Sequence, residues 1–173
     1  MNDELLGRPV RVALVLLLLL ELQLHVVDGI RIAGRHPLIL LLVPIGAALE
    51  GDASRAAVAG FVAGLALDLF LETPLGLSAL VFAIVGYGVA SFERGVIRAD
   101  AWLQPAVAGV ASGLGVVGLG AAAALFGQPQ YFRLSLLATV AVVAVTNTII
   151  ATPVVRMVRW ALGPVAVHGA MHV

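Results

Sequence analysis

The sequence contains no cysteine and no lysine. Without cysteine, disulfide bonds and thiolate-bound metal ions are excluded. Charge of either sign is also scarce, because charged residues make up 12% of the chain, against about 25% in soluble domains. The ten arginines balance ten acidic residues, so the net charge is zero and we expect no nucleic-acid partner.

Hydrophobic residues fill the sequence instead, at 61% of the chain with a mean hydropathy of +1.09. Soluble domains contain about 45–50% apolar residues, so the composition predicts an all-α integral membrane protein. No segment between the hydrophobic runs reaches the roughly 50 residues of a small domain, and we treat residues 1–173 as a single transmembrane domain. Binding or chemistry would therefore be carried by the helices or by very short loops.

Five segments are long enough to cross a bilayer as helices, which takes about 20 mostly apolar residues. They cover approximately residues 9–27, 54–71, 75–92, 102–126 and 132–155. A sixth run at 38–49 gives only about 18 Å of helix, against a hydrocarbon core of about 30 Å. It either crosses by starting near Ile30 or forms a re-entrant or interfacial piece. We expect a compact bundle of six transmembrane helices, with five spans as the alternative.

The arginine positions predict the orientation, because cytoplasmic loops carry an excess of basic residues. With six spans, seven arginines fall on the same side as the N-terminus: Arg8, Arg11, Arg55, Arg94, Arg98, Arg156 and Arg159. Three fall on the opposite side: Arg31, Arg35 and Arg133. Six spans therefore place both termini in the cytoplasm. Five spans with an external N-terminus give the same seven-to-three ratio, so the first span stays ambiguous.

Two of the predicted helices carry small residues at intervals of three or four, a spacing that lets helix backbones approach closely in lipid. On the 54–71 helix these are Ala57, Gly60 and Gly64, with Asp68 on the same face. On the 102–126 helix they are Ala106, Gly109, Gly113 and Gly120. Each face is a candidate for packing inside the bundle or for binding a partner's transmembrane helix. At least one must pack internally, since six helices need small residues among themselves.

Three acidic or histidine residues fall inside predicted spans: Glu21, His25 and Asp68. An Asp at mid-span costs about 2.5–3.5 kcal/mol on insertion scales, and intramembrane acids usually face a partner or a cavity. In a six-span bundle all three gather toward the external half, with Glu21 and His25 one helical turn apart. Three interpretations stay open: a proton or cation relay, a polar lock between the first and third spans, and a position near the interface where charge is tolerated.

Further along the chain, Asn147 is a candidate for an interhelical hydrogen bond, worth about 0.6 kcal/mol in membranes. Pro153 is expected to bend or end the last helix. Residues 164–173 contain His168 and His172 together with one glycine and one proline, and we predict a disordered tail. No nucleophile–base pair, phosphate-binding loop or metal-ligand motif is recognisable, so we expect no catalytic residues, no metal and no cofactor.

The segment around Asp68 carries a more specific signal. Gly60 and Gly64, three apolar residues, Asp68, and a short break ending in Pro74-Leu-Gly76 precede a new hydrophobic helix. This pattern resembles the rod shape-determining protein MreD family, and so do the continuation LSALVFAIVGYGVA and the chain length. The motif covers about 30 residues, while the remainder is similar in hydropathy only.

The resemblance implies a non-catalytic scaffold in the bacterial inner membrane that belongs to the cell-elongation machinery. It implies association with a bitopic MreC-like protein. Directly or through that protein it implies links to a RodA-type peptidoglycan polymerase with its transpeptidase partner, and indirectly to MreB filaments. It also implies a bundle similar to the S components of vitamin transporters, so a small-molecule-binding transporter subunit is the alternative function. The scaffold interpretation assigns partner binding to the Gly60/Gly64/Asp68 face or to the Gly109/Gly113 face.

Overall fold

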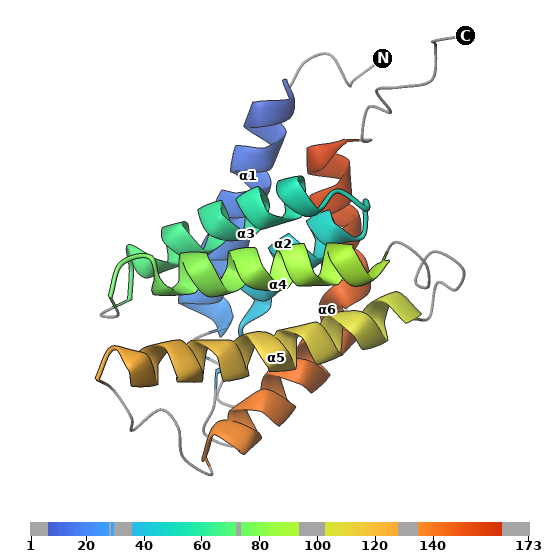
Figure 1. Ribbon diagram of the computed structural model, residues 1–173. Helices are drawn as coiled ribbons and strands as arrows, with labels where there is room; N and C mark the ends of the chain where they lie inside the picture. The colour runs from blue at the N-terminus through green and yellow to red at the C-terminus, as the bar shows by residue number, and fades with distance from the viewer. Residues whose placement is uncertain are drawn as a thin grey trace, which may run out of the picture.

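A computed structural model describes residues 7–27, 29, 36–71, 74–93, 103–127 and 135–163. In these ranges the chain is helical throughout and contains no strand. The α-helices are α1 (Arg8–Glu21), α2 (Leu42–Ala48), α3 (Ala53–Asp68), α4 (Leu77–Glu93), α5 (Leu103–Leu125) and α6 (Ser135–Leu162) (Figure 1). A π-helical segment (Leu22–Val27) extends α1, and a 3-10 turn (Ile39–Leu41) leads into α2.

Helices α3, α4 and α5 lie side by side and run in alternating directions, while α1 and α6 cross behind this layer (Figure 1). The closest pairs are α3 with α4 and α5 with α6. Helix α1 rests mainly on α6. The short α2 lies between the two layers and contacts α3, α4 and α6.

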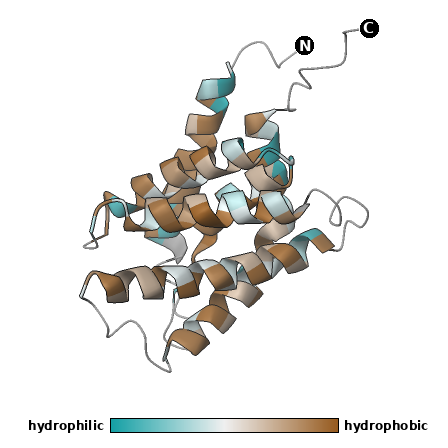
Figure 2. Cartoon of the chain, viewed as in Figure 1, coloured by the Kyte–Doolittle hydropathy of each residue, from teal (hydrophilic) through white to brown (hydrophobic). Residues whose placement is uncertain are grey.

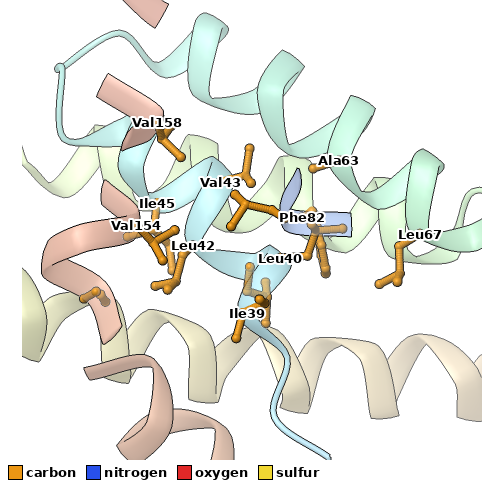
Figure 3. Close-up of a cluster of buried hydrophobic side chains, with 14 of the residues drawn as sticks. Ile39, Leu40, Leu42, Val43, Ile45, Ala63, Leu67, Phe82, Val154 and Val158 are labelled. Carbon is orange, nitrogen blue, oxygen red and sulfur yellow. The ribbon is translucent and has the colours of Figure 1, made fainter. Parts of the chain in front are cut away.

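Every residue of α2 and of the 3-10 turn before it is buried. Figure 3 shows Leu42 and Ile45 beside Val154 of α6, and Leu40 and Val43 beside Phe82 of α4. A helix that is hydrophobic all round belongs in the interior, which the run LILLLVPIGAAL satisfies. The described stretch Ile39–Ala48 is about 15 Å long, half of a bilayer core, so in this range it forms the centre of the bundle rather than a lipid-facing rod.

Residues along the helices are mostly hydrophobic, and hydrophilic residues lie chiefly near the helix ends (Figure 2). Large exposed side chains include Leu17, Phe61, Ile84, Leu114 and Ile149. Two of the described helices, Leu103–Leu125 and Ser135–Leu162, are long and apolar enough to cross a membrane. These features indicate a membrane protein, and the count of six spans stays a prediction.

Helices α3 and α4 pack backbone against backbone at glycines. A methyl group added at Gly60 would lie 2.4 Å from the carbonyl oxygen of Phe82, and one at Gly64 would lie 2.4 Å from that of Ser78. Such distances are far below van der Waals contact, so no side chain fits at either position. The structure thus places the Gly60/Gly64 face inside the bundle, against α4.

Helices α5 and α6 pack in the same way. A methyl group at Gly109 would lie 2.0 Å from the Thr148 hydroxyl oxygen, and one at Gly113 would lie 3.3 Å from the Val140 side chain. At Gly109 and Gly113 the second small-residue face therefore also meets a neighbouring helix of the same chain, whereas Ala106 is exposed.

Two prolines lie near helix ends. Pro74 precedes α4, which begins at Leu77 after a turn in which the Leu77 amide donates to the Pro74 carbonyl and Gly76 adopts a φ of +94°. Pro153, which we expected to bend or end the last helix, does not end α6, which continues to Leu162. The residues that follow Pro153, among them Val154 and Val158, are buried against the core, and this packing offsets the hydrogen bond that proline removes.

We expect Gly64→Ala to lower the free energy of unfolding by about 1–3 kcal/mol, because the added methyl group overpacks the α3–α4 contact. Gly88 of α4 is the matched control, since a methyl group there has no neighbour within 4 Å. Gly88→Ala should be neutral or stabilise by up to about 1 kcal/mol through helix propensity. Unfolding in detergent micelles, followed by circular dichroism, measures both; equal stability of the two variants would contradict the close contact.

Candidate functional site

The Asp68 side chain caps the N-terminus of α4 from the end of α3. Its Oδ2 accepts hydrogen bonds from the backbone amides of Gly76 at 2.9 Å, Ser78 at 3.0 Å and Ala79 at 3.4 Å, and Oδ1 accepts from Ser78 at 3.2 Å. The first amides of a helix have no partner within the helix, and its dipole favours a negative charge there. Asp68 supplies both acceptor and charge, and is only 2% exposed.

This cap explains the spacing of the sequence motif. Gly76 lies eight residues after Asp68, and its positive φ turns the chain so that successive amides point at one carboxylate. The bonds lock α3 to α4, so the predicted lock between the first and third spans had the wrong partner. Held by three backbone amides, the Asp68 carboxylate anchors the end of α3 to the start of α4.

Glu21 and His25 contact each other on the outer surface of α1 and its π-helical extension. His25 Nδ1 lies 2.9 Å from Glu21 Oε2, and the two side chains are 72% and 68% exposed. No described hydrogen bond or ion pair joins them to Asp68. The structure confirms their common helix face and does not show the three groups acting together.

Asn147 makes the predicted type of interhelical contact. Its Nδ2 donates to the Ser112 hydroxyl on α5 at 2.8 Å and to the Leu38 carbonyl at 3.0 Å, and the residue is fully buried. Gln23 was not predicted but does comparable work: its amide donates to the Pro37 carbonyl and accepts from the Ile39 amide, which ties the end of α1 to the start of the 3-10 turn. The sequence signal for Gln23 is its position between two ionisable residues, Glu21 and His25, in an otherwise apolar run.

A long apolar trough, which we call the α4–α5 groove, separates α4 from α5. Its volume is about 730 Å³, and its walls include Leu80, Ile84, Gly88, Val110, Leu114 and Gly118. Helix α4 packs closely on α3 and only loosely on α5. The groove therefore leaves large side chains such as Ile84 and Leu114 exposed.

A second hollow, the end cavity, lies where α3 ends and α4 and α6 begin. Its volume is about 670 Å³, and its lining is apolar except for Gln23, His36, Ser78, Ser135 and Thr139. Among the described residues no group of three or more His, Asp or Glu could hold a metal ion. The predicted tail 164–173, with its two histidines, lies outside the described residues.

We expect Asp68→Leu to destabilise the protein by more than about 2 kcal/mol, because it leaves at least two buried amides without an acceptor at about 1–3 kcal/mol each. Asp68→Asn keeps one acceptor oxygen and should lose about half as much. Asp52, which caps α3 by accepting from the Arg55 amide at 3.0 Å, is the matched control. Its replacement by Ala should cost about 1 kcal/mol. Denaturation in micelles tests the order, and equal losses for Asn and Leu at Asp68 would refute the cap.

Comparison with known proteins now identifies the family. The model of the rod shape-determining protein MreD family matches residues 6–159, which include every described helix except the last residues of α6. No curated protein and no solved structure matches the chain. The match extends far beyond the segment around Asp68, and the chain therefore belongs to the rod shape-determining protein MreD family.

Proposed function

We propose that this chain is a non-catalytic scaffold of the bacterial inner membrane that maintains rod shape by binding the transmembrane helix of a bitopic, MreC-like partner. Membership of the MreD family, a structural family that is not known for enzymes, suggests a role in rod shape determination. The hydrophobic outer surface and the two long apolar helices support a membrane location. The observation that carries the binding mechanism is the open α4–α5 groove.

The groove suits a partner better than the two small-residue faces do. Gly60 and Gly64 already meet the backbone of α4, and Gly109 meets α6. A partner helix could reach these glycines only by separating helices of the same chain. The groove, by contrast, exposes its own small residues: Gly88 has no neighbour within 4 Å of an added methyl group, and Ala121 is exposed.

The dimensions of the groove indicate a helical occupant. Its residues on α5 run from Leu103 to Leu125, which corresponds to about 33 Å of helix, close to the roughly 30 Å of a bilayer core. Its lining is apolar along the whole of this length. Helix association in lipid depends on close packing rather than on the hydrophobic effect, and small residues beside large ones provide that packing. A single transmembrane helix lying along α5 fits these requirements.

The termini of the helical bundle support the proposed topology. Arg8 at the start of α1 and Arg55 at the start of α3 both donate to the carbonyl oxygen of Leu162 at the end of α6. The first and last described helices thus have their outer ends together, as an even number of spans requires. We propose six spans with both termini cytoplasmic. Through the MreC-like partner the chain would connect to a RodA-type polymerase, its transpeptidase partner and, indirectly, MreB filaments.

The end cavity favours a second candidate, a small-molecule-binding subunit similar to the S components of vitamin transporters. Ligand pockets typically enclose about 300–1,000 Å³ and combine an apolar lining with a few polar groups, as this cavity does. A single mutation distinguishes the scaffold from the transporter subunit. Thr139→Phe, which occupies the end cavity, should leave partner binding intact if the chain is a scaffold and should abolish ligand uptake if it is a transporter subunit.

We expect Ala121→Leu and Gly88→Leu to reduce co-purification of a bitopic MreC-like partner by about tenfold, which corresponds to about 1.4 kcal/mol. Each substitution fills the α4–α5 groove from one wall. Pull-down from detergent-solubilised membranes, normalised to the amount of each variant in the membrane, measures the effect.

Ala141→Leu is the matched control, because Ala141 is exposed on α6 and lies outside the groove. It should retain the partner at the level of the unmodified chain. If both groove variants also retain it, the groove is not the docking site. If all three variants lose the partner equally, the loss comes from adding a large side chain at any exposed position, and the assignment to the groove is wrong.

A further inference from the structure

The end cavity is polar at one end and apolar at the other. Ser135 and Thr139 line it on the first two turns of α6, and Ser78 lines it on the first turn of α4. Farther along the helices its walls are the apolar side chains of Val116 on α5 and Val143 on α6. Val143 follows the first residue of α6 by eight positions, which corresponds to about 12 Å of helix. The cavity is therefore amphipathic, and its depth suits an elongated molecule.

The hydroxyl of Ser78 is buried at this cavity without a partner. Ser78 is only 3% exposed, and its backbone amide donates to Asp68. Within the described part of the chain its hydroxyl makes no hydrogen bond. A hydroxyl has one donor and two acceptor sites, and a buried polar group is costly when it is left unpaired. A molecule in the cavity that carries a hydroxyl or an amide would supply the missing bond.

The Thr139 hydroxyl adds a second acceptor to the same cavity. It donates to the Ser135 carbonyl at 3.2 Å, so its proton is in use while its oxygen can still accept. Ser78 can both donate and accept. The two hydroxyls together suit a ligand group that is itself a donor and an acceptor, such as an alcohol.

The charges around the cavity disfavour a charged ligand. Among the described residues that line it there is no Arg, Asp or Glu, and the ionisable His36 is exposed. Asp68 keeps its negative charge next to Ser78 and so disfavours an anion, while its own oxygens already accept from three backbone amides. Burying a charge without a counter-charge costs far more than burying a hydroxyl.

We propose that the end cavity binds an uncharged amphipathic alcohol, such as a long-chain alkanol or a monoacylglycerol. Its hydroxylated end lies among Ser78, Ser135 and Thr139, and its apolar chain points toward Val116 and Val143. This binding holds for a scaffold and for a transporter subunit alike. Only the approach of the ligand from the external side rests on the proposed six-span topology.

Photolabelling of the chain in lipid nanodiscs tests this inference. A dodecanol that carries a diazirine in mid-chain is compared with the carboxylic acid and the amine of the same length, and mass spectrometry locates the adducts. We expect the alcohol to label the cavity walls around Leu119 and Leu136 about tenfold more than either charged probe. Unlabelled 1-dodecanol should compete, and glycerol, which has hydroxyls but no chain, should not.

Ser78→Ala and Thr139→Val should each reduce this labelling about fivefold, because each removes one hydrogen bond to the ligand. Thr148→Val is the matched control for Thr139→Val. The Thr148 hydroxyl donates in the same way, to the Ala144 carbonyl at 2.8 Å, and lies outside the cavity. The control should keep the labelling.

Equal labelling of the cavity variants and the control would overturn the role of the hydroxyls. Stronger labelling by the acid or the amine would overturn the uncharged ligand, and competition by glycerol as strong as by dodecanol would overturn the amphipathic one. Adducts confined to lipid-facing residues such as Ile149 would mean that the cavity holds water only. If Ser78→Ala does not fold, Thr139→Val and Thr148→Val decide the matter. None of these outcomes depends on partner binding or on transport.

Discussion

The contact between α3 and α4 is the constraint on which the remaining packing depends. Backbone meets backbone at Gly60 and Gly64, and Asp68 closes the pair by holding the first amides of α4. The two helices thereby form a flat unit that covers one side of α2, while α6 covers another. Because α4 is drawn so closely to α3, its opposite face is left without an equally close neighbour, and the α4–α5 groove is the result.

Much of this arrangement was predictable, and the failures have physical reasons. Hydropathy located the helices, and the spacing of Gly60, Gly64 and Asp68 identified a close contact, because lipid-embedded helices associate through small residues. The spacing of glycines does not show which helix packs against them, so the sequence could not distinguish a helix of the same chain from a helix of a partner. A charged residue in an apolar run correctly identified Asp68 as important. Its role could not be predicted, because the sequence does not show which backbone amides will lie next to it in the fold. The groove could not be predicted because it is a space between side chains. Gly88 and Gly86 of α4 look alike in the sequence, but only Gly86 has neighbouring atoms close to it in the fold.

The glycines of α4 and α5 accordingly divide into two kinds. At Gly86 and Gly109 atoms of the same chain lie within 3 Å of where a side chain would begin, so no other helix can approach there. Gly88 faces open space. Filled notches make the bundle rigid, and an open one leaves a shaped surface exposed.

The bond from Arg8 to the Leu162 carbonyl joins residues 154 positions apart, and α6 is also the main support of α1. Helix α1 therefore lacks its main neighbour until α6 has been made, although Gln23 at its end can already bond to Pro37 and Ile39. At about 5–20 residues per second this interval lasts roughly 8–30 seconds. During that time α1 stays in the membrane with its future contact face turned to lipid or to a temporary companion such as an insertase, and docking is completed only after translation has passed the final helix.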